Sequence, residues 1–370
     1  MKKHITLLFI FFYTLTVSAQ SFNVFLIDAE TKQPVSQAVL INEDESFSTI
    51  SNDKGEVTLP QLVLNKRIYI QDYLYLKEAK VFTDLQNYVW EIQPNTETLE
   101  EVIIDKNIKI TLQEVIANSI KSFSKDIKLN TYYRENYYND KSLACFGDGI
   151  VDFYIEKTSY IQSVIKQSRT KSFAATSNTN MRASYSLENV IDATMQFRVI
   201  QEFLKDKKYE FYVTAKQVGN KTIHICYFNS KEKVKKRLLR NGYFVFDADK
   251  KLILESRFGL DPHKQKYNKA MNFVLGKIHI SGFEFHSKYV DTETSYYPSF
   301  ARNKKQGNFN SKLAKIDNEK LNNEVYFYVL RASKIEKIPV SFSATGTLYS
   351  KGTKYSYEFW NIPEIKNLIN

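Results

Sequence analysis

The sequence contains little cysteine, proline and glycine. Its 370 residues include 2 Cys, 7 Pro and 11 Gly. Two cysteines cannot form the disulfide framework of a small secreted domain, and the low glycine and proline counts exclude collagen-like and low-complexity chains. The hydrophobic fraction of 43% and charged fraction of 25% are ordinary for globular proteins, so global disorder is not expected. The length predicts two domains.

Long hydrophobic runs are also scarce. The longest, residues 5–17, follows the basic residues Lys2 and Lys3 and precedes small residues that end at Ala19. This order is typical of a secretory signal peptide, residues 1–19, with cleavage between Ala19 and Gln20. An uncleaved anchor is the alternative, and the run is short for a membrane-spanning helix. No cysteine follows the run, so a lipidated N-terminus is not indicated. We therefore expect an exported protein.

Aromatic residues, by contrast, are abundant, with 25 Tyr and 26 Phe. Aromatic side chains favour strands, so the composition indicates a mainly β protein. Residues 22–28 alternate between apolar and polar, residues 38–41 form a short apolar run, and residues 52–55 read as a turn. Because no helical period competes in residues 20–96, this part is predicted to be a small antiparallel β-sandwich.

Two turn motifs in this part carry a family resemblance. Thr31 and Pro34 form a Thr-x-x-Pro turn, and Asp53 and Gly55 form an Asp-x-Gly turn. Their spacing resembles that of the carboxypeptidase regulatory-like domain, although Gln37 replaces the usual glycine. The resemblance implies a seven-stranded, transthyretin-like β-sandwich without catalytic function. Such modules are common at the start of surface proteins of gram-negative bacteria, which implies a location in the periplasm or at the outer membrane.

The segment after the sandwich has a resemblance of its own. Residues 99–104 are similar to the segment that ends this module in TonB-dependent outer-membrane receptors. Too few residues follow Ile104 for the large transmembrane domain of those receptors, so their transport function is not carried over. Residues 97–110 are expected to be a linker.

Residues 111–370 are predicted to form a larger antiparallel β domain that opens with a helix. Thr111 and Glu114 match a capping box. Six apolar residues fall on one face at helical spacing and predict core packing: Leu112, Val115, Ile116, Ile120, Phe123 and Ile127. Residues 186–204 fit either a second helix or a strand. Many segments rich in Tyr, Phe, Ile and Val follow residue 130, and residues 247–250 read as a hairpin turn.

A helix followed by a long meander loosely resembles the half-barrel of periplasmic lipoprotein-carrier proteins. We therefore expect a curved sheet or half-barrel with one or two helices.

Motifs of known chemistry are lacking. The sequence has no phosphate-binding glycine loop, no His-Glu-x-x-His, no Gly-x-Ser-x-Gly and no Cys-x-x-Cys. No catalytic residue and no cofactor are predicted. His279, Glu284 and His286 could meet at a metal ion only if a bulge at Gly282 bent the strand, so packed or surface roles are favoured and no metal site is predicted.

The candidate binding residues are Tyr133, Arg134 and Glu135. Arg134 and Glu135 could anchor an anionic ligand, but neighbours on a strand point to opposite faces, so separate cross-strand salt bridges are the favoured interpretation. The Tyr-Arg-Glu signature resembles one in uncharacterised exported bacterial proteins. Cys145 and Cys226 could form one disulfide in an oxidising compartment.

Positive charge exceeds negative charge, with 52 Lys and Arg against 41 Asp and Glu. Removing Lys2 and Lys3 with the signal peptide lowers the formal charge from +11 to +9. Basic residues gather in residues 231–240 and at Arg302, Lys304 and Lys305. Outside the cytoplasm such clusters suit acidic glycans or anionic lipid, although solvated loops or strand edges are the favoured reading.

These features favour an exported cell-envelope protein with a non-catalytic binding or assembly role. Its expected partner is an envelope protein, glycan or lipid, with peripheral association with the outer membrane and no nucleic acid. A periplasmic lipid or lipoprotein carrier is the first alternative, which an open apolar cavity would favour and a solid core would exclude. A hydrolase of envelope polymers is the second, which requires a cleft with a catalytic constellation.

Overall fold

The computed structural model describes most of the chain. It covers residues 20–95, 99–103, 107–139, 142–157, 160–173, 187–218, 221–274, 276–313, 315–320, 322–337 and 346–361, together with Ile365 and Leu368. The expected signal peptide, including Ala19 at its cleavage site, lies outside the described residues.

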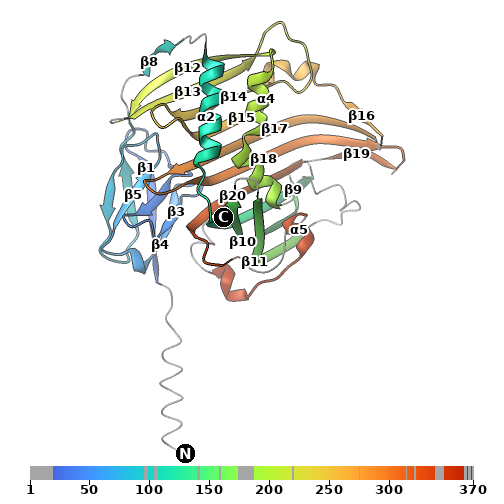
Figure 1. The fold of residues 1–370 in the computed structure, drawn as a ribbon. Helices are drawn as coiled ribbons and strands as arrows, with labels where there is room; N and C mark the ends of the chain where they lie inside the picture. The colour runs from blue at the N-terminus through green and yellow to red at the C-terminus, as the bar shows by residue number, and fades with distance from the viewer. Residues whose placement is uncertain are drawn as a thin grey trace, which may run out of the picture.

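The N-terminal part is a sandwich of two small sheets (Figure 1). One sheet has the strand order β4-β1-β7 and the other β3-β2-β5-β6, and every pairing is antiparallel except that of β1 with β7. Buried and half-exposed residues alternate along β1, as expected for a strand with one face in a core. The predicted seven-stranded β-sandwich is confirmed. Its strands are β1 (Ser21–Asp28), β2 (Val39–Asn42), β3 (Ser48–Ile50), β4 (Glu56–Pro60), β5 (Arg67–Gln71), β6 (Ala79–Val81) and β7 (Tyr88–Ile92).

The turn before β4 explains one residue of the sequence motif. The Asn52 side-chain oxygen accepts hydrogen bonds from the backbone N–H groups of Lys54 and Glu56, both at 2.9 Å. Gly55 has a φ of 74°, and a Cβ at this position would lie 2.5 Å from the carbonyl oxygen of Leu26. Both the conformation and the close approach require glycine.

The strands that the structure describes from β8 onward form one sheet of thirteen. Its order is β11-β10-β9-β20-β18-β17-β15-β14-β13-β12-β8, with β16 paired to β17 and β19 to β18. The described strands β11 and β8 end this path without pairing to each other, so the sheet is open, and its long strands curve (Figure 1). The predicted large antiparallel sheet is confirmed.

Most strands of this sheet are long. The thirteen described strands are β8 (Leu99–Ile103), β9 (Ile127–Asn139), β10 (Ser142–Lys157), β11 (Tyr160–Ser172), β12 (Tyr209–Val218), β13 (Lys221–Ser230), β14 (Arg240–Asp247), β15 (Leu252–Leu260), β16 (Met271–Phe273), β17 (Gly276–Asp291), β18 (Tyr296–Ser311), β19 (Ile316–Lys320) and β20 (Asn322–Lys334). Short 3-10 helices occur at η1 (Gln61–Val63), η3 (Pro262–Tyr267) and η4 (Tyr357–Asn361).

The stretch expected to be a linker contains regular structure. Strand β8 pairs with β12 at one edge of the large sheet, so these residues belong to the sheet. Helix α2 (Ile108–Ser122) then begins after Asn107, which makes no side-chain cap. The predicted capping box of Thr111 and Glu114 is therefore wrong. The helix begins about one turn earlier in the sequence, because Ile108 packs against the core as part of the helix. Glu114 instead pairs with Lys251 at 2.7 Å.

The predicted apolar face of α2 is largely confirmed. Leu112, Val115 and Ile116 are buried, and Ile120 packs against the core. The helix ends before Phe123, whose backbone is extended, so Ile127 is buried as the first residue of β9 instead of continuing the helical stripe.

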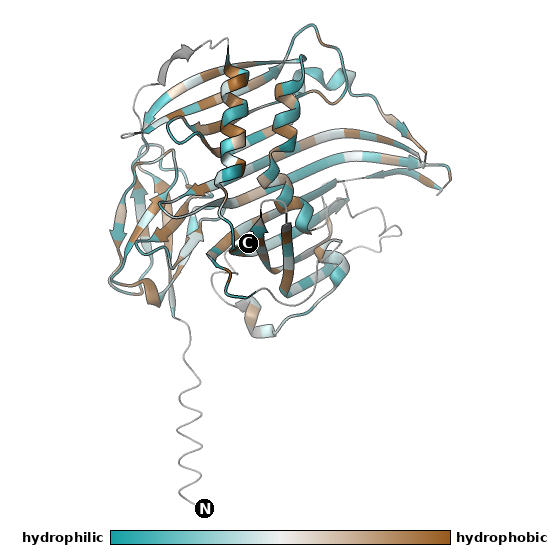
Figure 2. Ribbon diagram, in the orientation of Figure 1, coloured by the Kyte–Doolittle hydropathy of each residue, from teal (hydrophilic) through white to brown (hydrophobic). Residues whose placement is uncertain are grey.

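Residues 187–205 are helical, as one of the two interpretations proposed. They form α3 (Leu187–Gln196) and α4 (Arg198–Lys205), which Phe197 separates with a left-handed φ of 48°. Figure 2 shows apolar and polar residues around both α2 and α4. Within the described residues, no helix is long and apolar enough to cross a membrane.

The large sheet lies between the helices and the sandwich. On β14, Phe244 and Phe246 join the core that contains the helices, whereas Tyr243 and Val245 join a small cluster with Tyr73 of the sandwich. Neighbouring residues of one strand thus serve opposite faces.

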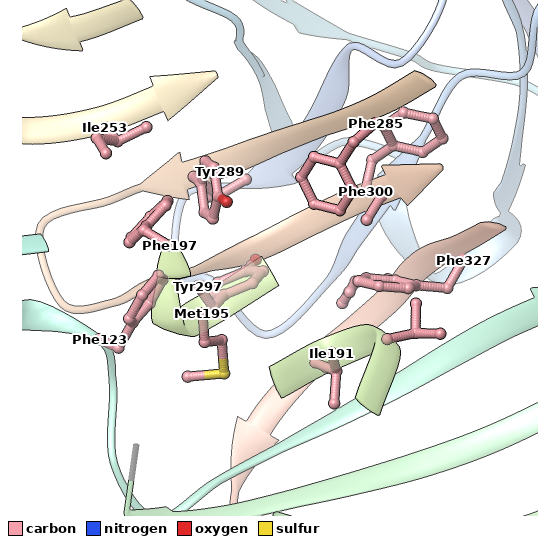
Figure 3. Close-up of a cluster of buried hydrophobic side chains, with 14 of the residues drawn as sticks. Phe123, Ile191, Met195, Phe197, Ile253, Phe285, Tyr289, Tyr297, Phe300 and Phe327 are labelled. Carbon is pink, nitrogen blue, oxygen red and sulfur yellow. The ribbon is translucent and has the colours of Figure 1, made fainter. Parts of the chain in front are cut away.

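The core between helices and sheet is aromatic (Figure 3). The ring of Phe123 stacks on that of Tyr296 at 4.6 Å and lies 5.8 Å from that of Phe197. Figure 3 labels ten side chains of the larger buried cluster to which this core belongs: Phe123, Ile191, Met195, Phe197, Ile253, Phe285, Tyr289, Tyr297, Phe300 and Phe327. The excess of aromatic residues therefore fills a core.

Candidate functional site

The three candidate binding residues lie on β9 but do not share a pocket. Tyr133 is fully buried beside the ring of Phe153. The Glu135 carboxylate accepts hydrogen bonds from the backbone N–H groups of Leu348 (2.8 Å) and Tyr349 (3.0 Å), in the short helix α5 (Leu348–Lys351). Tyr133 thus packs in the interior, and Glu135 binds the C-terminal segment.

Burial decides the protonation of Glu135. It raises the pKa of this carboxyl from 4.5 to about 7, although the N–H groups of Tyr349 and Leu348 oppose the shift. An ionised form is therefore costly in this place, and the group titrates near neutral pH.

Arg134 points to the other face and meets a buried carboxylate. Asp148 is directly opposite Arg134 in the register of β9 and β10, with 3.8 Å between Nη1 of Arg134 and Oδ2 of Asp148. Arg169 of β11 binds the same carboxylate through two bonds, Nε to Oδ1 at 3.0 Å and Nη2 to Oδ2 at 2.6 Å. Tyr132 donates its hydroxyl to Oδ2 at 2.9 Å. Two guanidinium groups therefore share one fully buried carboxylate.

These two arginines line a surface hollow of about 510 Å³, which we call the β9–β11 cleft. Its described lining contains three cations and no carboxylate, since Asp148 lies beneath the surface. Phe173 (53% exposed) and Tyr355 (40% exposed) present aromatic surface at its mouth. The cleft is lined by Arg134, Leu143, Phe146, Arg169, Thr170, Lys171, Phe173, Thr353 and Tyr355.

Aromatic rings fix the arginines in place. The guanidinium carbons of Arg134 and Arg169 lie 4.7 and 5.2 Å from the centre of the Phe146 ring. Arg169 also lies 4.4 Å from the Trp360 ring. Planar guanidinium groups held on ring faces are pre-organised for carboxylate or phosphate groups, because little side-chain freedom remains to be lost on binding.

Sequence reasoning found only Arg134 of this cleft. Its other members come from β10, β11 and the C-terminal segment, and no local spacing relates them. The one available signal was Asp148, an acidic residue in the otherwise apolar stretch of residues 143–151, since a buried carboxylate needs a cationic partner.

A second hollow, of about 220 Å³, lies between the sandwich and the large sheet. Its charged groups already have partners within the protein. The Lys288 ammonium lies 3.1 Å from Asp72, and Lys250 lies 2.7 Å from Asp291. The Gln71 amide donates to the carbonyl oxygen of Asp291 at 2.6 Å. We interpret this hollow as the polar contact that joins the two parts.

Glu255 is the centre of that contact. It accepts the hydroxyls of Tyr73 (2.6 Å) and Tyr243 (2.8 Å) and lies 2.9 Å from His286 Nε2. Burial alone would raise its pKa, but the His286 hydrogen bond and the charge of Lys288 lower the pKa to about 2. Glu255 therefore stays ionised under the sandwich.

The three residues considered from the sequence as metal ligands, His279, Glu284 and His286, each have a different partner. His286 binds Glu255, Glu284 pairs with Arg257 at 2.9 Å, and His279 Nε2 lies 2.9 Å from the carbonyl oxygen of Asn268. The expected bulge does occur, as a register shift between Ile280 and Gly282. Among the described residues, no group of His, Cys, Asp or Glu is arranged to hold a metal ion.

The cysteines and basic clusters are also separate. Cys145 and Cys226 are not joined to each other, and both are buried on β10 and β13, which six other strands separate in the sheet. The first basic cluster occupies the loop between β13 and β14, where most of its side chains are exposed. In the second, Arg302 is paired with Glu324.

Comparison with known proteins adds no relative: the chain matches no protein-family model and no curated protein.

Proposed function

We propose that this chain is an exported, non-catalytic binding protein of the cell envelope and that the β9–β11 cleft holds an anionic group of its ligand. The observation that carries the proposal is the pair of ring-stacked arginines, with Lys171 beside them, in a hollow whose described lining has no carboxylate. The exposed rings of Phe173 and Tyr355 add flat apolar surface. Charge and rings together suit an acidic glycan.

The packed interior weighs against a lipid or lipoprotein carrier. A carrier needs an apolar cavity for an acyl chain. Here the rings of Phe123, Phe197, Tyr289 and Tyr296 occupy the space between the helices and the sheet, with centroid distances of 4.6 to 6.0 Å.

A hydrolase receives little support from the Glu255–His286 pair. His286 is 9% exposed and Glu255 3%, and both lie under the sandwich. The hydroxyls that reach Glu255 belong to Tyr73 and Tyr243, so the pair serves the contact between the two parts.

The proposal predicts selective binding of acidic polysaccharide. Mature protein should bind alginate, a polymer of uronic acids, more tightly than neutral dextran, and binding should weaken as salt is added. Lys171→Gln and Phe173→Ala should each lower the affinity for alginate roughly three- to tenfold, because each removes one charged or aromatic contact without uncovering Asp148. Isothermal titration calorimetry measures both effects.

The matched control is Lys166→Gln. Lys166 is exposed on the same strand but does not line the cleft. It should leave the affinity unchanged. Equal loss in this variant, or equal binding of alginate and dextran, would reject the proposal.

A further inference from the structure

A four-stranded arm projects from the body of the protein (Figure 1). It consists of β16, the first half of β17, the second half of β18, and β19. Buried residues of β17 occur only from Phe285 onward, so the first half of the strand lies outside the core. From Phe283 to Gly276 the strand extends about 20 Å.

Two turns meet at the end of this arm. Phe273 pairs with Gly276 in one hairpin, and Ser311 pairs with Ile316 in the other. Lys277 is opposite Asn310, so the two hairpins lie side by side and their turns project from the same end. Gly276 permits this arrangement, because a Cβ there would lie 2.3 Å from the carbonyl oxygen of Asn310.

The turns expose apolar side chains. Val274 is 100% exposed, Leu313 80% and Phe273 58%. These side chains therefore bury little surface in the isolated chain, and large exposed apolar groups in a cluster indicate an interaction site.

Lysines surround the apolar side chains. Lys277, Lys312 and Lys315 are exposed next to the two turns. Residues 269–278 and 310–320 together contain five lysines and two acidic residues, so the end of the arm is positive.

We propose that this arm tip, formed by Phe273, Val274 and Leu313 with Lys277, Lys312 and Lys315, docks on an anionic lipid surface. The apolar side chains enter the interface between headgroups and acyl chains, and the ammonium groups contact the headgroup charges. A lipid surface fits this tip better than a protein partner does. A stable protein interface buries roughly 800 Å² on each partner, and two turns at a narrow convex tip offer far less area. Lipid headgroups and acyl chains, by contrast, can rearrange around an inserted side chain.

Vesicle sedimentation tests the proposal directly. Mature protein should sediment with vesicles of phosphatidylcholine and phosphatidylglycerol in equal amounts, and only weakly with phosphatidylcholine alone. The variants F273S/V274S/L313S and K277E/K312E/K315E should each lower binding at least about tenfold, since they remove either the inserted groups or the charge attraction. All six positions are exposed, so circular dichroism should show an unchanged fold.

Two control variants test whether vesicle binding depends on the arm tip or on exposed apolar or basic residues in general. Leu62→Ser removes a similarly exposed leucine (62%) from the sandwich. K233E/K235E lowers the charge of the densest basic cluster. Both should bind vesicles like the unchanged protein. Equal binding by the arm-tip variants, or equal loss in these controls, would overturn the proposal.

A tryptophan placed at the tip reports insertion. The native Trp90 and Trp360 are 4% and 9% exposed and should give a constant background. Val274→Trp should show a blue shift of emission with anionic vesicles, and vesicle binding without this shift would overturn the proposal. Sedimentation velocity gives a further test. Dimers that form without lipid and are absent in F273S/V274S/L313S would also overturn the proposal, because the tip would then bind a second copy.

Discussion

Two buried glutamates in this protein have opposite pKa shifts. Glu135 has mainly neutral neighbours, and burial raises its pKa to about 7. Glu255 is as deeply buried, yet His286, Lys288 and Tyr73 lower its pKa to about 2. The partners therefore determine whether burial favours the acid or the carboxylate.

Glu135 should make the protein less stable as the pH rises. Its folded pKa of about 7 exceeds the ordinary value of 4.5, so the folded form holds the proton more tightly. Stability should then fall between about pH 4.5 and pH 7, by about 3 kcal/mol at most, and remain lower above that range. Glu135→Gln should flatten this decline, as urea unfolding at about pH 5 and about pH 8 can measure.

Glu114→Gln is the control, because Glu114 is half-exposed on the surface of α2. It should retain the full decline of stability with pH. An equal decline in Glu135→Gln would assign the pH dependence to another group.

At the scale of single elements, the sequence predicted best where each strand or helix has one face in a core. The alternation of β1, the hairpin of β14 and β15, and the apolar stripe of α2 were all recognisable. Strands β11 and β18 lack such a pattern. Residues of β11 are largely polar because it is the last strand of the sheet, and the second half of β18 is polar because it runs into the arm. A local pattern cannot show that a polar segment pairs with a distant strand.

The same limit applied to the cleft. The sequence offered Arg134 as a candidate anchor for an anion, with a cross-strand salt bridge as the favoured interpretation, and the alternation rule correctly placed Glu135 on the opposite face. Arg169 lines the cleft with Arg134 because β9, β10 and β11 pair side by side. Tyr355 joins them because the C-terminal segment returns to β11. No local sequence pattern specifies either arrangement.

A buried hydroxyl of helix α2 is hydrogen-bonded to strand β15. Ser119 Oγ donates to the carbonyl oxygen of Val115 at 2.8 Å and accepts the backbone N–H of Ile253 at 2.9 Å. Ser119→Ala should lower the free energy of unfolding by about 1–3 kcal/mol, because the N–H of Ile253 loses this acceptor in a buried place. Urea denaturation measures the change.

Ser122→Ala provides the comparison, since Ser122 is exposed at the end of the same helix. Its stability should differ from that of the unchanged protein by no more than about 0.5 kcal/mol. If both variants are equally stable, the hydroxyl of Ser119 does not hold the helix.

At the scale of the whole molecule, a buried ion pair couples the sandwich to the large sheet. The Lys288 ammonium and the Asp72 carboxylate face each other at 3.1 Å across the contact. Lys288→Met should destabilise the protein by about 3–5 kcal/mol, because it leaves the Asp72 charge buried without its main partner. In the double variant D72N/K288M the loss should be smaller than the sum of the two single losses.

The two tryptophans allow each part to be observed separately. Trp90 lies in the sandwich core and Trp360 beside the cleft. With the other tryptophan replaced by Phe, the two fluorescence transitions in urea should coincide in the unchanged protein and separate in Lys288→Met. Coinciding transitions in both would mean that the ion pair does not couple the two parts.

The C-terminal segment also covers part of one edge of the large sheet. Strand β11 is the last strand at its end of the open sheet, and such a strand presents backbone groups that can pair with another chain. Ser168 of β11 exchanges two backbone hydrogen bonds with Lys354, at 2.9 and 2.8 Å. Through this bridge the returning chain occupies part of the exposed edge. The segment that completes the cleft thereby also protects the sheet against edge-to-edge aggregation.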